Sequence, residues 1–225
     1  VDMNQNNKFQ NNRNRPCEDF SFESIRNYDT TRLCLCYKLL NLERNKHLLA
    51  ARPYIPYLDL AIVFYVPYAD DGRLHEINIT TAMMQSWKVD VGTLYADANQ
   101  HIAKFLPATI NSLSSSLNKD SDEPKASEPD VPLYVVSNRM ELYGAASILY
   151  DGLLQASANL FEDDIIVLPS STDYMIFLPA SAAPNPVSLV KGMLTFVNQT
   201  ELAPDEVLSD NVYYYSKLND SLHIM

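Results

Sequence analysis

A stretch that is poor in apolar side chains limits how this chain can fold. Residues 112–131 read SLSSSLNKDSDEPKASEPDV and are rich in Ser, Pro and acidic residues. They offer too little apolar surface to offset the entropy cost of ordering the backbone, so they are typical of a flexible loop or linker. We therefore predict two sequential lobes, residues 17–111 and 132–225. Residues 1–16, rich in Asn and charge, are predicted to be a flexible lead-in.

The first lobe is predicted to contain helices and one antiparallel hairpin. Apolar residues recur at helical spacing within residues 30–49, TTRLCLCYKLLNLERNKHLL, which predicts a helix there. The apolar run over 57–68 predicts a buried strand. The turn signal at 70–72 and the alternating residues 73–80 predict the returning strand of a hairpin. Further helices are predicted over 80–88 and, from an Asp90 cap, over 91–106.

The second lobe shows a similar mixture of elements. Strands are predicted over 132–138, 164–169, 173–179 and 211–218, and helices over 144–161 and, after the start signal Asn185-Pro186, over 187–197. The second and third of these strands are close enough in sequence to form a hairpin. Antiparallel hairpins with helices packed on one face place the chain in the α+β class.

Charge and glycine content argue against several kinds of partner and cofactor. Lys and Arg number 17 against 28 Asp and Glu, a formal net charge of -11. This charge repels phosphate backbones, unless a local patch such as residues 8–15 acts alone. No apolar run approaches the roughly 20 residues of a membrane helix. With five glycines the chain has neither a Walker loop nor G-x-G-x-x-G. We therefore expect no nucleic-acid partner, no membrane insertion and no nucleotide cofactor.

Cysteine and histidine usage predicts reduced thiols and no metal site. The cysteines are Cys17, Cys34 and Cys36, and the last two lie two apart in a predicted helix, where their side chains point about 200° apart. A disulfide between them is therefore disfavoured. None of the four histidines has a second histidine at the spacing of H-E-x-x-H. Buried reduced thiols, no bound metal, no cofactor and a cytoplasmic location are expected.

The segment VLPSSTDYMIFLP, residues 167–179, contains the candidate serine nucleophiles Ser170 and Ser171. Ser, Thr and Asp are favoured in turns because their side chains hydrogen-bond to nearby backbone amides, so a hairpin corner is the favoured interpretation. The strained G-x-S-x-G turn of serine hydrolases is absent. A hydrolase-like alternative needs a histidine beside one of these serines, or Cys36 paired with His101.

Three consecutive tyrosines offer a candidate binding surface. In a strand, Tyr213 and Tyr215 share one face and Tyr214 lies on the other. A tyrosine face open to solvent suits contact with a protein or peptide. We name Tyr213, Tyr215, Asp210 and Asn211 as candidate binding residues. The competing interpretation is that one tyrosine face belongs to the core and the other to an ordinary sheet edge.

Six segments in order across residues 18–217 together resemble an uncharacterised bacterial family of gut Firmicutes, the domain of unknown function 5688. They are CYKLLNLERNKHLL, IPYLDLAIVFYV, WKVDVGTLY, PLYVVSNRMELYGAASILY, VLPSSTDYMIFLP and LAPDEVLSDNVYYYS. The course from Gly144 to Val197 is also distantly similar to the family of unknown function 1444. Members of the first family carry a further N-terminal segment, so we expect the chain, which begins with Val1, to be part of a longer protein. The resemblance implies no activity, cofactor or catalytic residue.

The missing catalytic signatures and the tyrosine strand together favour a non-enzymatic α+β protein that binds a protein or peptide partner. A second interpretation is an acidic regulatory module that masks a basic partner through complementary charge. The alternative class is a hydrolase-like enzyme with a serine or cysteine nucleophile, for which Ser170, Ser171 and Cys36 are the candidates.

Overall fold

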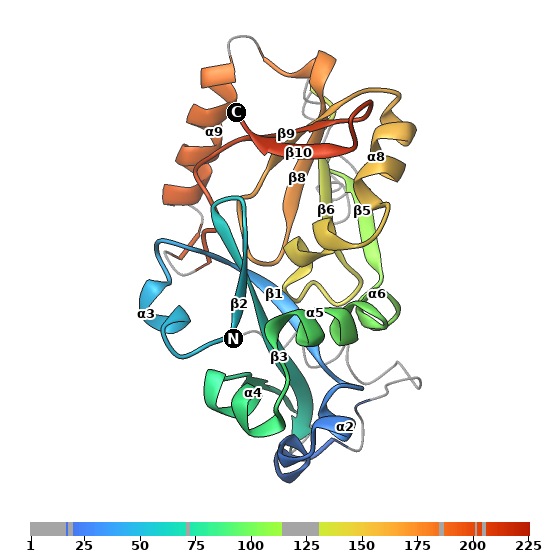
Figure 1. Cartoon of the computed structure of the whole chain (residues 1–225). Helices are drawn as coiled ribbons and strands as arrows, with labels where there is room; N and C mark the ends of the chain where they lie inside the picture. The colour runs from blue at the N-terminus through green and yellow to red at the C-terminus, as the bar shows by residue number, and fades with distance from the viewer. Residues whose placement is uncertain are drawn as a thin grey trace. The chain divides into compact units, whose positions relative to one another are not determined.

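The computed structural model describes residue 17 and residues 20–70, 73–113, 131–184, 187–200, 202–203 and 206–225. Two compact units divide the chain, residues 1–107 and 108–225 (Figure 1). The boundary precedes a strand, β5 (Ala108–Ser112), that belongs to the second unit. The predicted divider over 112–131 therefore lies inside the second unit, and residues 114–130 of it lie outside the described residues, as does the predicted lead-in over 1–16.

The first unit is built on a four-stranded antiparallel sheet. Its strands are β1 (Cys36–Asn41), β2 (Tyr54–Tyr57), β3 (Leu60–Asp70) and β4 (Arg73–Asn78). Tyr65 in β3 pairs with Cys36 of β1 on one side and with Asn78 of β4 on the other. β2 pairs with the beginning of β3, on the same side as β4. The predicted hairpin over 57–80 is thus confirmed as β3 and β4, while its turn residues 71–72 lie outside the described residues.

The predicted helix over residues 30–49 is wrong. Its centre forms β1, and only its ends are helical, in α2 (Tyr28–Thr31) and α3 (Lys46–Leu49). All six residues of β1 are buried, because the strand pairs along β3 and is covered on both faces. A strand buried on both faces lacks the alternation of apolar and polar residues that would reveal its period. Its apolar run therefore satisfied the helical spacing equally well.

Short helices complete the first unit, and their bounds are η1 (Phe22–Arg26), α4 (Thr81–Trp87), α5 (Val91–Asn99) and α6 (Ile102–Phe105). The Asp90 cap is confirmed, since its carboxylate accepts a hydrogen bond from the Thr93 amide at 2.7 Å. α5 packs on one face of the sheet, where the Tyr37 ring stacks on Tyr95 at 5.5 Å. Leu49 of α3 packs on the opposite face, in a cluster with Leu40, Ala61 and Val63.

The second unit is built on a six-stranded antiparallel sheet in the order β10-β9-β7-β8-β6-β5. The further strands are β6 (Tyr134–Asn138), β7 (Ile165–Leu168), β8 (Met175–Pro179), β9 (Tyr213–Ser216) and β10 (Ser221–Ile224). The predicted hairpin over 164–179 is confirmed, because Ile165 pairs with Pro179 and Leu168 with Ile176. With two antiparallel sheets and separate helices, the α+β class is confirmed.

Helices lie on both faces of this second sheet, whereas they were predicted to pack on one face (Figure 1). Their bounds are η2 (Gly144–Leu149), α8 (Leu153–Phe161), η3 (Ala180–Ala182) and α9 (Val187–Thr200). Val190 and Leu194 of α9 pack in one buried cluster with Ile166 and Leu178. The start signal Asn185-Pro186 lies outside the described residues. Within the described ranges, no helix combines the length and apolar character that crossing a membrane requires.

Candidate functional site

The candidate serine Ser170 lies in a buried hydrogen-bond network. Its hydroxyl is 0% exposed and donates to Asn198 Oδ1 at 2.9 Å. Asn198, on α9, donates in turn to the Ser209 carbonyl at 2.9 Å and to Asp210 Oδ1 at 3.0 Å. The structure therefore brings together two of the predicted site residues, Ser170 and Asp210, through an asparagine that sequence reasoning did not single out.

This network positions backbone and supplies no base to Ser170. An amide oxygen accepts a hydrogen bond but does not take up the hydroxyl proton, which a nucleophilic serine must lose. Ser171 Oγ accepts from the Asp173 amide at 3.1 Å, a local turn contact. Two histidines face other groups: His101 Nε2 lies 2.8 Å from the Leu35 carbonyl, and the His223 ring contacts Tyr214. The geometry of this loop is that of a hairpin corner.

The same corner is held by two segments distant in sequence. Leu208 N donates to the Ser170 carbonyl and Ser209 N to the Pro169 carbonyl, each at 3.0 Å. From the other side, Tyr143 N donates to Asp173 Oδ1 at 2.8 Å. Gly144 allows this approach, since a Cβ there would lie 2.5 Å from the Asp173 carbonyl oxygen.

Asn211, the remaining polar candidate, borders the same network. Its amide donates to Ser209 Oγ at 2.9 Å, and its side-chain oxygen accepts from Lys191 Nζ at 3.3 Å. Asp210 and Asn211 are both partly exposed. Their predicted role in binding a partner stays a prediction.

The candidate nucleophile Cys36 is buried in β1 at 1% exposure. Burial raises the pKa of its thiol to about 12, and a hydrogen bond with Tyr65 offsets part of that shift. The thiol is therefore protonated near neutral pH, whereas the thiolate is the nucleophilic form. The suggested partner His101 has its Nε2 against the Leu35 carbonyl.

The expectation of reduced thiols is wrong for the other two cysteines. Cys17 and Cys34 form a disulfide, with their Cα atoms 5.6 Å apart, and Cys36 is the free cysteine. Helical spacing bears only on the close pair Cys34 and Cys36, and a turn and a strand replace the predicted helix around them. Cysteine usage therefore gives no support to the predicted cytoplasmic location.

A polar cluster that sequence reasoning missed occupies one face of the first sheet. Lys38 Nζ lies 2.8 and 2.9 Å from the two carboxylate oxygens of Glu76, and 5.4 Å from the centroid of the Tyr65 ring. Asn78 donates to the Glu76 carboxylate at 2.9 Å, and Arg52 donates to Asn78 at 3.0 Å. The Lys38 side chain is 6% exposed and that of Glu76 is 30% exposed. The pair joins β1 to β4 across the intervening strand β3. Because β1 was predicted to be helical, this contact could not be predicted.

The tyrosine strand does not present the predicted surface. Tyr213 and Tyr215 are 0% and 1% exposed, so their shared face belongs to the core and is closed to a partner. The Tyr215 hydroxyl lies 2.6 Å from Gln155 Oε1 and 2.5 Å from Asp220 Oδ1. Tyr214, on the other face, is partly exposed and donates to Asp164 Oδ2. Of the two interpretations of the tyrosine strand, the burial of these side chains fits the one in which one face belongs to the core and the other is more open.

We expect the second unit to lose stability in alkali. The hydrogen bond to Asp164 raises the pKa of Tyr214 to about 12, and burial followed by the hydrogen bond to Asp220 raises the pKa of Tyr215 to about 12, from an ordinary value of 10.0. The unfolded chain therefore ionises first. The stabilisation is fully present below about pH 10 and is lost as pH rises toward about 12.

Urea titrations at successive alkaline pH values, followed by circular dichroism, measure this loss. Tyr214→Phe removes one of the two ionising groups, so the variant's free energy of unfolding should fall less steeply over the same range. A free energy that stays level up to about pH 12 would contradict the assignment.

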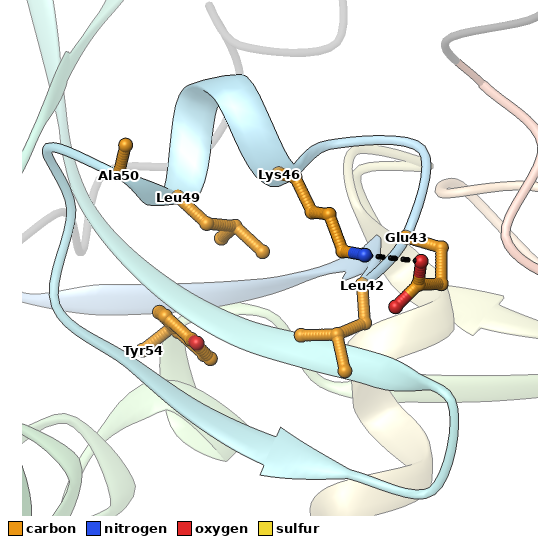
Figure 2. Close-up of a pocket in the computed structure, with 6 residues that line it drawn as sticks. All are labelled: Leu42, Glu43, Lys46, Leu49, Ala50 and Tyr54. Atoms are coloured by element: carbon orange, nitrogen blue, oxygen red, sulfur yellow. Dashed lines mark ion pairs between the residues drawn. The ribbon is translucent and has the colours of Figure 1, made fainter.

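A hollow with a volume of about 240 Å³ opens beside α3 in the first unit. Its lining residues come from α3, the turn before it and β2, and they are Leu42, Glu43, Lys46, Leu49, Ala50 and Tyr54. Figure 2 shows the Leu42, Leu49 and Tyr54 side chains around one space, with the ion pair of Lys46 and Glu43, 2.5 Å long, at one end. The Tyr54 residue is 38% exposed. The floor is thus apolar and the rim charged.

A metal centre has no candidate in the described part of the chain, where no three His, Cys, Asp or Glu side chains gather to hold an ion. The chain matches the family described as "Family of unknown function (DUF5688)" over residues 4–217. No curated protein and no solved structure matches the chain. The distant similarity to the second family between Gly144 and Val197 stays a prediction.

Proposed function

Since the chain belongs to the family of unknown function DUF5688, which assigns it no activity, we propose from its own geometry that it is a non-enzymatic protein that binds a partner peptide. The binding site is the hollow beside α3. One large apolar side chain of the peptide fills it, and polar residues on either side of that anchor meet the rim.

The observation that carries this proposal is the pairing of an apolar floor with a charged rim. Leu42, Leu49 and Tyr54 supply apolar surface, and filling the hollow removes that surface from water. Glu43 and Lys46 offer one charge of each sign next to the opening. Apolar centres inside polar rims are the usual anatomy of protein interfaces.

The size of the hollow favours a side chain over a free ligand. Its volume of about 240 Å³ is below the roughly 300–1,000 Å³ of sites that enclose drug-sized molecules. Tyr54 at the edge is partly exposed, and a tyrosine provides a broad contact surface with few rotatable bonds. A peptide anchored by one leucine, methionine or aromatic residue suits these dimensions.

The states of Ser170 and Cys36, two of the three candidate nucleophiles, support a non-enzymatic role. Ser170 donates its proton to an amide oxygen, and the Cys36 thiol has its pKa raised far above neutrality. Neither group has the activated form that covalent catalysis needs.

Peptide selection against the folded chain tests the proposal. Peptides enriched from a random display library should share one large apolar anchor, and Ala50→Trp should weaken their binding at least about tenfold by filling the hollow. Ala51→Trp is the matched control, because Ala51 is also exposed but does not line the hollow. Fluorescence polarisation with labelled peptides gives the dissociation constants.

Equal binding to Ala50→Trp and to the unchanged chain would remove the proposed site. Failure to enrich any anchored peptide, with the disulfide verified intact by mass spectrometry, would count against peptide binding altogether.

A further inference from the structure

Helix α9 presents apolar side chains on two opposite sides. Val190 and Leu194 are 3% and 2% exposed and pack on the sheet of the second unit. On the outer side Leu189 is 55% exposed and Phe196 is 66% exposed. A helix that is apolar on two sides is typical of a helix covered by two neighbours. Among the described residues, only the side of Val190 and Leu194 is covered.

A glycine lies between the two exposed apolar residues. At about 100° per residue, Leu189, Gly192 and Phe196 fall within an arc of about 60° on the outer side. A Cβ at Gly192 would meet nothing within 4 Å, so packing among the described residues does not require glycine there. Glycine inside a helix is unfavourable relative to alanine. Its use is explained if another backbone approaches the helix at this point.

We propose that α9 pairs antiparallel with α9 of a second copy of this chain, about a two-fold axis near Gly192. Leu189 lies three residues before the glycine and Phe196 four residues after it, so the stripe is nearly symmetric about its centre. An antiparallel copy then places Phe196 of each chain beside Leu189 of the other. Self-complementary patches of this kind form closed dimers.

The charge distribution favours a second copy over a different partner. The chain carries a net charge of -11, yet α9 contains no acidic residue and one cation, Lys191. An acidic partner would find one lysine, whose Nζ already donates to Asn211. A basic partner would be drawn to the acidic surfaces instead. Two copies repel each other at long range, and α9 is a surface on which they meet without bringing acids together.

The small contact area and the net charge of the two copies each predict a property of the dimer. It buries less than the roughly 1,200–2,000 Å² of a standard interface, so the dimer should be weak, with a dissociation constant on the order of 100 μM. Added salt screens the repulsion between the two acidic copies. Dimerisation should therefore tighten as the salt concentration rises, opposite to the response of a complex with a basic partner.

Sedimentation equilibrium of the full chain over a range of concentrations tests the proposal. We expect Phe196→Ser and Gly192→Leu each to weaken dimerisation at least about tenfold. Gly192→Leu replaces glycine by a strong helix former in open space, so its melting temperature should stay level or rise while association is lost. Leu160→Ser, on α8, removes a similarly exposed leucine (68%) and should leave association unchanged.

A chain that stays monomeric at concentrations well above about 100 μM in moderate salt overturns the proposal. Dimers that weaken with added salt, or that tolerate Gly192→Leu, also overturn it, because the contact would then lie on another surface or involve charged groups.

Discussion

Replacing Glu76 by alanine is expected to lower the free energy of unfolding of the first unit by about 3–5 kcal/mol. The Lys38 ammonium lies within 2.9 Å of both Glu76 oxygens, and its side chain is 6% exposed. Without the carboxylate the ammonium remains in a site that water reaches poorly, which costs far more than the pair contributes net. Urea unfolding followed by the fluorescence of Trp87, the chain's one tryptophan and a residue of the first unit, measures the change.

A double variant separates the buried charge from ordinary loss of packing. Lys38→Met combined with Glu76→Leu removes both charges and keeps apolar volume, so most of the lost stability should return. Arg26→Met breaks a pair whose side chains are 80% and 69% exposed, and its effect should stay within about 1 kcal/mol. An unrecovered double variant, or a small effect of Glu76→Ala, would show that the pair does not hold the strands together.

Breaking the disulfide is expected to lower the free energy of unfolding of the first unit by about 3 kcal/mol. Cys17 and Cys34 are separated by 17 residues in sequence, and the bond restricts the unfolded chain over that loop. The double variant Cys17→Ser with Cys34→Ser removes the bond and leaves Cys36 in place. Trp87 fluorescence in urea again reports the unit concerned.

Reductant provides the internal control for this prediction. The unchanged chain should lose the same stability when its disulfide is reduced, while the double variant should not respond. Intact-mass measurement before and after alkylation verifies the state of each sample. A variant as stable as the oxidised chain would show that the bond contributes little to folding.

Strong local patterns allowed much of the fold to be predicted from sequence. The hairpin of β3 and β4 combines a long apolar run with a turn signal and an alternating return strand, and each of these signals is local. The Asp90 cap and the apolar spacing that predicts α9 are local in the same sense. Elements of this kind are specified by residues within a few positions of one another.

The features that could not be predicted from sequence depend on contacts between residues far apart in the chain. β1 is a strand because β3 lies beside it, and its own residues fit a helix equally well. The disulfide depends on where the chain places Cys17 relative to Cys34. Lys38 and Glu76 meet only after three strands have assembled, so neither residue was notable by itself.

In the candidate site, too, local features could be predicted from sequence and features that depend on long-range packing could not. The interpretation of Ser170 and Ser171 as turn residues needed only local chemistry, and the geometry fits it. The burial of Tyr213 and Tyr215 could not be predicted, because alternation tells which tyrosines share a face but not which face is closed to solvent. The hollow beside α3 requires a helix, a turn and a strand together, and no sequence motif marks it.

The long-range closure of the corner at Ser170 has a consequence for how the protein is made on the ribosome. Leu208 and Ser209 secure that corner, and β9 lies between β7 and β10, so the second unit cannot complete its sheet until residues 206–225 have been synthesised. The first unit has its sheet, ion pair and disulfide within residues 17–107 and can complete them earlier. Nascent chains therefore pass through a stage in which β7 lacks its neighbour β9 and the edge of this apolar strand is unpaired.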